Sequence, residues 1–190
     1  MMTSRMKSVG FAVVAGLVFS AFGQEATNAV EKPVPVVQAK DVAPFMYAAL
    51  EMTGSYDQHS QAFQDLYQNA GAQGVAMDQP PFGLYFNSPE NTPQEQLKWD
   101  LGLPCSETVK LSPPLKLKKW EFEKVAVLTY TGPYEAEGAK AFQTLFQWIG
   151  QNKYVFAGPV MEKFLSMPVA DEKGQWSGTV EVSVPIQAAQ

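Results

Sequence analysis

Apolar residues recur along the chain with two different spacings, one typical of helices and one typical of strands. Phe142, Leu145, Phe146 and Ile149 lie three or four positions apart, which predicts a helix with one apolar face packed on a sheet. Valines alternate with other residues over 179–186, which predicts a strand with its valines toward the helix layer. Runs rich in apolar and β-branched residues predict further strands at 82–87, 97–103, 115–122, 124–130 and 160–166.

The pattern occurs twice. TGSYDQHSQAFQDLYQ at 53–68 aligns with TGPYEAEGAKAFQTLFQ at 131–147, and WDLGLP at 99–104 aligns with VEVSVP at 180–185. The helix stripe is repeated as Phe63, Leu66, Tyr67 and Ala70. Each copy therefore reads strand, strand, helix, strand, strand, and the copies span about 34–105 and 106–188. Because each copy is too small to be robust alone, we expect the two to pair into a single α+β domain over 34–188.

The first residues resemble an export signal. Arg5 and Lys7 precede an uninterrupted apolar run, Val9–Phe22, which is too short to span a bilayer comfortably. Small residues at 21 and 23 predict cleavage near Gly23–Gln24. Segment 1–23 is thus interpreted as a signal peptide and 24–33 as a flexible leader, which predicts a periplasmic or secreted protein without membrane insertion. Retention of the signal as an anchor is the alternative.

Charge disfavours nucleic acid as a partner. The chain has 14 Lys and Arg against 19 Asp and Glu. Removal of the signal takes away two cations and no acid, which leaves twelve cations against nineteen acids, a net charge of −7. A chain this acidic is repelled by phosphate backbones unless a basic patch is concentrated locally. The one basic cluster, at 116–119, alternates with apolar residues and is interpreted as the solvated face of a strand.

The sequence contains few residues for metal or cofactor chemistry. Cys105 is the only cysteine, so no intramolecular disulfide forms, and it is interpreted as a small buried filler. His59 is the only histidine and is interpreted as a surface residue of the first helix. No phosphate-binding loop, nucleophile elbow or metal-spaced pair is present in the sequence. We therefore expect no metal and no cofactor, and a binding function rather than catalysis.

Glu181 is the most suggestive polar position. Alternation around it places Glu181 and Ser183 on the face opposite the valines. If that face is solvent, Glu181 is a surface acid. If it is a groove, Glu181 is a partly desolvated carboxylate that neutralises a ligand cation or acts as a general acid or base. Asp100 is its partner in the repeat. Five apolar residues on or beside the predicted strands are expected to line the same groove: Tyr85, Trp99, Met161, Phe164 and Trp176.

These motifs carry a family likeness. KVAVLTYTGPYE at 124–135, the helix end FQWI, the Gly-Pro before a strand and the final VEVSVPI resemble the GyrI-like small-molecule-binding superfamily, which includes effector-binding domains of AraC- and MerR-type regulators. The likeness extends from about Pro35 to Gln187. It implies a pseudo-twofold tandem of two βαββ modules, with antiparallel sheets, one long helix each and a ligand groove between them. It also implies that an acid in the last strand, matched by Glu181, contacts cationic lipophilic ligands.

The resemblance leaves three hypotheses. The leading one is a small-molecule-binding module for a lipophilic, cationic or aromatic ligand. The second is a hydrolase of reactive small molecules, since some stand-alone relatives are reported to use such a glutamate; here Glu181 would take that role. The third is a structural or protein-interaction module. No helix-turn-helix segment precedes the domain, so the chain departs from the fused regulators. A monomer or a homodimer is expected.

Overall fold

The computed structural model describes residues 35–189, and the predicted signal and leader lie outside this range. Within it are two α-helices, two 3-10 turns and ten strands, in the order β1 (Gln38–Asp41), β2 (Phe45–Thr53), η1 (Tyr56–Gln58), α1 (His59–Ala72), β3 (Phe82–Tyr85), η2 (Gln94–Gln96), β4 (Lys98–Pro104), β5 (Leu115–Trp120), β6 (Lys124–Pro133), α2 (Tyr134–Gln151), β7 (Tyr154–Phe156), β8 (Val160–Phe164), β9 (Val169–Ala170) and β10 (Trp176–Ala188).

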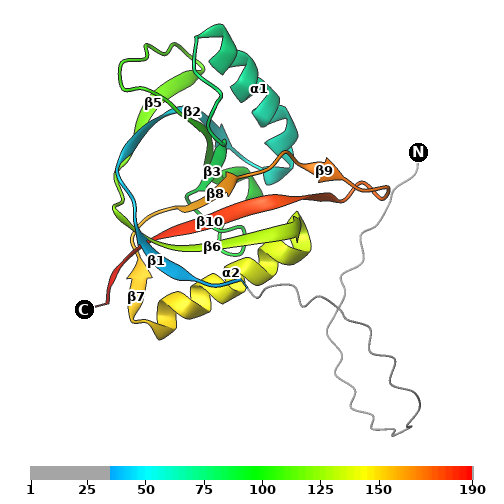
Figure 1. Ribbon diagram of the computed structural model, residues 1–190. Helices are drawn as coiled ribbons and strands as arrows, with labels where there is room; N and C mark the ends of the chain where they lie inside the picture. The colour runs from blue at the N-terminus through cyan, green and yellow to red at the C-terminus, as the bar shows by residue number, and fades with distance from the viewer. Residues whose placement is uncertain (1–34, 190) are drawn as a thin grey trace, which may run out of the picture. The chain divides into compact units, whose positions relative to one another are not determined.

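All ten strands belong to one antiparallel sheet that curls strongly (Figure 1). Its main order is β1-β6-β10-β8-β3-β4-β2-β5, and the short strands β7 and β9 pair with β10. The pairing of β8 with β3 joins the two halves of the sheet, because the strands on either side of that pair come from different repeats. The α+β class predicted from the sequence is confirmed: a large antiparallel sheet carries two helices.

The first strand of each repeat pairs in the other half of the sheet. β1 pairs with β6, and β5 pairs with β2. β5 lies within the span assigned to the second repeat, yet its register partners Phe45–Leu50 belong to the first. The pattern of apolar residues indicates which residues form a strand. It does not indicate which other strand of the sheet that strand will pair with. The strands β7 and β9 were not predicted, because two or three residues are too few to show alternation. Two strands were expected before the first helix, but no residue range was predicted for β1 or β2.

Both helices cover the same face of the sheet, here called the helix face. Leu101 and Leu50 on this face pack beneath α1, and Val182 and Leu128 pack beneath α2. Each helix also buries small residues that were not predicted in its stripe. The buried residues are Ala62, Leu66 and Ala70 in α1, and Gly138, Ala141, Leu145 and Ile149 in α2. Tyr67 and Phe146, predicted to lie in these stripes, are exposed instead.

The opposite face, here called the inner face, has its own apolar cluster. Strand alternation directs every second residue to it, and the curl of the sheet brings distant strands together there. Its buried members are Tyr47, Ala49, Phe82, Leu84, Trp120, Val125 and Met161. Phe82 packs edge-on against Tyr47, with ring centroids 5.2 Å apart. No helix of the described residues is long and apolar enough to cross a membrane.

Candidate functional site

A glutamate lies on the helix face at the junction of the two halves of the sheet. In β8 the residues Met161 and Lys163 face inward, so Glu162 faces the helices together with its register partners Val182 and Gly83. Gly83 has no side chain, and the Tyr85 hydroxyl, which hydrogen-bonds to Glu162, occupies the space that a Cβ would take. The sequence positions Glu162 by simple alternation, but its central location results from the pairing of β8 with β3.

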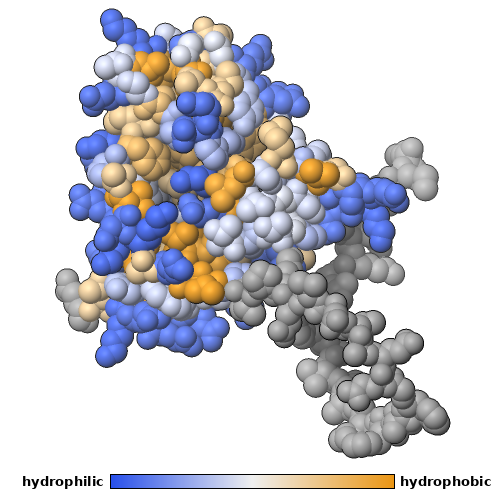
Figure 2. All heavy atoms as spheres, in the orientation of Figure 1, coloured by the Kyte–Doolittle hydropathy of each residue, from blue (hydrophilic) through white to orange (hydrophobic). Residues whose placement is uncertain are grey.

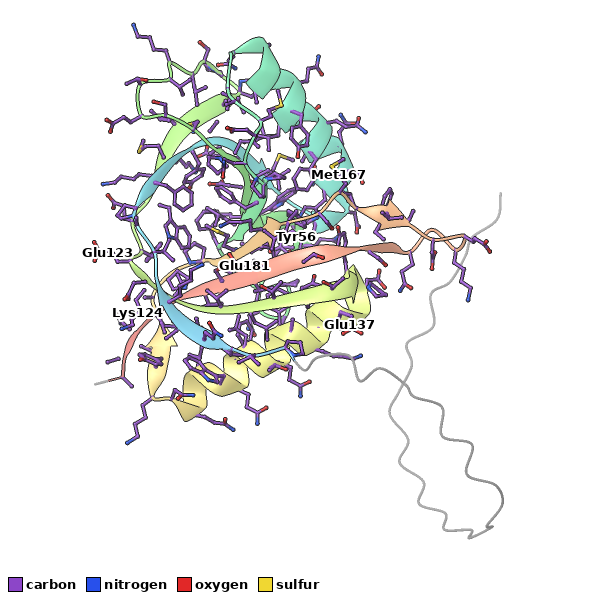
Figure 3. All side chains as sticks on the ribbon, in the orientation of Figure 1. Tyr56, Glu123, Lys124, Glu137, Met167 and Glu181 are labelled. Atoms are coloured by element: carbon purple, nitrogen blue, oxygen red, sulfur yellow. The ribbon has the colours of Figure 1, made fainter. Side chains whose placement is uncertain are left out.

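Aromatic side chains from both halves surround this carboxylate. We call this group the Glu162 cluster: Glu162, Tyr56, His59, Phe63, Tyr85, Trp99, Tyr130, Tyr134 and Phe164. Tyr56, from the turn before α1 (Figure 3), packs edge-on against Tyr85 with centroids 5.1 Å apart. Phe63 of α1 meets Phe164 of β8 edge-on at 5.3 Å. The rings therefore bridge the two halves of the sheet.

Burial dominates the electrostatics of Glu162. It raises the pKa of the carboxyl above its usual range, and a hydrogen bond with the Tyr85 hydroxyl acts in the opposite direction. After burial, which is the main cause in each case, the Glu162 charge also helps to raise the pKa of four tyrosines: Tyr56, Tyr85, Tyr130 and Tyr134. Among residues 35–189, no cationic side chain forms an ion pair with Glu162. Within this part of the chain, Glu162 therefore has no counter-ion.

His59 belongs to the cluster, so its assignment as a surface histidine is wrong. Its Nε2 atom lies 3.0 Å from the Tyr85 hydroxyl, and its ring centroid lies 4.5 Å from that of Trp99. The first turn of α1 folds over β3 and β4, which sequence patterning did not show. Burial lowers the pKa of the imidazole, which keeps it neutral at pH 7. His59 therefore does not supply the missing positive charge.

Two glycines make room for tyrosine hydroxyls in this region. A Cβ on Gly83 would approach the Tyr85 hydroxyl to 2.6 Å, and a Cβ on Gly178 would collide with the Tyr134 hydroxyl. The Tyr134 oxygen is buried and has no hydrogen-bond partner within the described part of the chain. Buried hydroxyls without a partner are costly and uncommon, so this group is available to a ligand atom.

The structure divides the residues that the sequence assigned to one groove between two faces. Tyr85, Trp99 and Phe164 lie in the Glu162 cluster. Glu181, Met161 and Asp100 lie on the inner face. Trp176, at the start of β10, is 51% exposed. Sequence reasoning missed Glu162, although a signal existed: Glu162 lies two positions from both Val160 and Phe164 on a predicted strand, so strand alternation places this acid on the same face as two apolar residues.

Asp100 is compensated on the inner face by lysines of β5. Lys118 Nζ lies 2.8 Å from Asp100 and 2.7 Å from Glu51, and Lys116 completes the group by pairing with Glu51. Burial raises the pKa of Asp100 and the hydrogen bond from Lys118 lowers it. Hydrogen bonds from Lys116 and Lys118 lower the pKa of Glu51 to about 2. Asp100 is therefore committed to a structural network.

Replacing Lys118 by methionine should leave the Asp100 carboxylate buried without its partner. We expect the free energy of unfolding at pH 7 to fall by about 1–3 kcal/mol. The loss should shrink as the pH falls and Asp100 becomes protonated, because the neutral carboxyl needs no counter-ion. Lys116→Met is the matched control: Lys116 is largely exposed, so the loss should stay below about 1 kcal/mol. Chemical denaturation from pH 4 to 8 measures both, and equal losses would contradict this account.

The described residues contain no group of three or more His, Cys, Asp or Glu side chains arranged to hold a metal ion. The Glu162 cluster instead offers ring faces, one carboxylate without a counter-ion and one free hydroxyl. Ring faces and a desolvated carboxylate both attract positive charge. The site is therefore suited to recognition of a flat or cationic molecule.

Comparison with known proteins supports a shared fold. The C-terminal domain of EcmrR superposes with a TM-score of 0.67 at 12% identity, covering 83% of this chain and 100% of that domain. EcmrR in a complex with DNA gives 0.67 at 13% identity over 82% of this chain, which spans only 58% of that protein. An uncharacterized conserved protein from Listeria innocua gives 0.63 at 14% identity, covering 85% and 97%. At such identities the likeness shows the fold alone.

No curated protein sequence matches this chain significantly. The GyrI-like small molecule binding domain matches residues 35–187, which is nearly the whole described range. That match agrees with the sheet, the two helices and the resemblance of the motifs. The chain belongs to the GyrI-like small-molecule-binding domain family.

Proposed function

We propose that this protein binds a small, flat, lipophilic cation in the Glu162 cluster, between two βαββ modules related by the repeat. The observation that carries the proposal is a half-buried, desolvated carboxylate that has aromatic neighbours and no cationic partner in the described residues. The family match supports small-molecule binding in general. The proposal also places the protein, cleaved near Gly23–Gln24, in an extracytoplasmic compartment, as a monomer or homodimer.

The energetics favour a cationic ligand over a neutral or anionic one. Desolvating a carboxylate without a counter-ion is costly, and here the cost appears as a raised pKa that the hydrogen bond with Tyr85 only partly offsets. A bound cation would offset this cost and restore the charged form of Glu162. Aromatic faces add about 0.5–2 kcal/mol for each favourable cation–π contact. An anion would meet both the carboxylate and the negative faces of the rings.

Comparing a charged ligand with an uncharged ligand of the same shape tests this proposal on the wild-type protein. N-methylquinolinium and quinoline have the same ring system, but at pH 8 only the first is charged. We expect N-methylquinolinium to bind at least tenfold more tightly, because only the cation gains the interaction with Glu162. Isothermal titration calorimetry at pH 8 measures both affinities. Equal affinities, or tighter binding of quinoline, would remove cation recognition from the function.

The same titration should depend on pH with a definite sign. Because the pKa of Glu162 is raised, a fraction of the carboxyls is protonated in the free protein, and cation binding must release that proton. Affinity should therefore rise with pH, by up to about tenfold per unit below the pKa of Glu162, and level off above it. An affinity for N-methylquinolinium that is constant from pH 4 to 8 would contradict a role for this carboxyl.

A further inference from the structure

A hollow of about 260 Å³ opens on the inner face, on the opposite side of the sheet from Glu162. We call it the inner hollow. Part of its lining is apolar: Val42, Ala43, Phe45, Trp120, Val125, Val127 and Met161. The rest is polar: Lys40, Asp41, Lys163, Glu181 and Ser183. Figure 2 shows hydrophobic side chains among polar ones on the face of the molecule where β1 forms the edge of the sheet. Glu181 lies on β10 (Figure 3).

A difference between the two repeats accounts for the inner hollow. Aligning Thr53 with Thr131 places Tyr47 of β2 opposite Val125 of β6. Tyr47 is buried and its ring fills the inner face of the first half. Val125 is much smaller, so the same volume in the second half is not filled. A difference of this size normally leaves a void unless the neighbours collapse into it, and here the void is open to solvent.

The charged residues also correspond, but they pair differently. Lys118 is the register partner of Tyr47, and Lys40 is the register partner of Val125. In the first half Lys118 contacts Asp100 directly at 2.8 Å. In the second half, Glu181 takes the place of Asp100 but pairs with Lys163 across the strands, at 3.6 Å.

Lys40 therefore remains without an acidic partner among residues 35–189, although it and Glu181 line the same hollow. The direct contact of the first half is replaced by a gap with a cation on one side and a carboxylate on the other. The lining has two lysines and two acids, Lys40, Lys163, Asp41 and Glu181, so its formal charges cancel. A balanced lining disfavours a ligand with a net charge and favours one that carries both charges.

We propose that the inner hollow is a second binding site, and that its ligand is a small zwitterion with an apolar body, of the class of apolar α-amino acids. The ligand carboxylate would meet Lys40, its ammonium group would meet Glu181, and its side chain would lie against Phe45 and Trp120. The volume of about 260 Å³ is below the roughly 300–1,000 Å³ of clefts for drug-sized ligands, which favours a ligand as small as an amino acid. The site does not depend on the cation site proposed above, because the two lie on opposite faces.

Three related compounds test the charge requirement. L-phenylalanine carries both groups, 3-phenylpropionate lacks the ammonium group and phenethylamine lacks the carboxylate. We expect L-phenylalanine to bind at least tenfold more tightly than either of the others, in titrations followed by amide chemical shifts. Lys40→Met and Glu181→Gln should each reduce the affinity for L-phenylalanine at least tenfold. Similar affinities for the three compounds, or no binding at millimolar concentration, would overturn the proposal.

Filling the hollow provides an independent test. Val125→Tyr copies the residue of the first half and should abolish L-phenylalanine binding. Val125 is buried, so Val127→Phe, at a partly buried position of the lining, is the second variant in case the first does not fold. Glu162→Gln is the control, because it changes the other face and should leave L-phenylalanine binding intact. If a folded filled variant binds as tightly as the wild type, the inner hollow is not the site. N-methylquinolinium binding by the filled variants reports separately on the proposed cation site.

Discussion

Glu162→Gln should weaken the binding of N-methylquinolinium at least thirtyfold. This factor corresponds to about 2 kcal/mol, the low end of the cost of losing one partner of a buried charge pair. Glutamine preserves the size of the side chain, so the surrounding rings should remain in place. The dependence of affinity on pH should disappear with the titrating group. Calorimetric titration of both proteins from pH 4 to 8 measures the affinity and its pH dependence together.

Glu181→Gln is the matched control for this experiment. Its carboxylate is on the adjacent strand, faces the other side of the sheet and already has Lys163 as a partner. N-methylquinolinium affinity should change less than threefold in this variant. The stability of the two variants should also differ. Because burial raises the pKa of Glu162, the wild type loses free energy of unfolding as the pH rises through that pKa, whereas Glu162→Gln should not. A Glu181→Gln variant that loses binding while Glu162→Gln retains it would reverse the assignment.

Trp99→Ala should lower the free energy of unfolding by about 3–5 kcal/mol, the range for removing a large aromatic side chain from a core. Trp99 is 0% exposed, contacts the rings of Tyr56 and His59, and donates its indole N–H to the Gly54 carbonyl 3.1 Å away. The substitution therefore removes the ring against which Tyr56 and His59 pack, and it leaves the Gly54 carbonyl without the indole N–H donor. Thermal and urea denaturation measure the loss.

Trp176→Ala is the control for the tryptophan prediction. Trp176 is half exposed at the start of β10, so its removal should change the free energy of unfolding by less than about 1 kcal/mol. If the two substitutions have equal effects, Trp99 does not anchor the core beneath α1. Both tryptophans were expected from sequence to line one groove, and only their burial distinguishes them.

Local patterns in the sequence predicted the elements well. The alternating valines of β10 are buried against α2, and both predicted helices are present. Alternation also predicted that Glu181 lies on the face opposite Val180 and Val182, as the structure shows. These features depend on the periodicity of a single strand or helix, which neighbouring residues determine.

Features that depend on distant contacts could not be predicted in this way. Glu162 is central only because β8 pairs with β3, and the sequence does not show that pairing. His59 is polar and sits at the start of a helix, yet the turn before α1 folds it against Trp99. Tyr85 and Glu181 were assigned to one groove because both lie on strands near aromatic residues. Whether residues of two different strands lie on the same face can be decided only when the register between those strands is known.

The two proposed sites use opposite faces of adjacent strands. Glu162 on β8 faces the helices and has no counter-ion in the described residues, whereas Glu181 on β10 faces the inner hollow and pairs with Lys163. A carboxylate without a partner favours a cation, and a balanced set of charges favours a zwitterion. The two faces of one sheet would thus bind two different classes of ligand. Single substitutions on one face should affect the binding of only one class.

A crystal structure of the protein with bound N-methylquinolinium tests the central claim most directly. The account predicts that the ring system lies among the aromatic residues of the Glu162 cluster, with its charged nitrogen within about 6 Å of the Glu162 carboxylate, the range over which opposite charges influence each other strongly. Occupancy of the inner hollow instead, or a cation bound elsewhere with the Glu162 cluster unchanged, would contradict it.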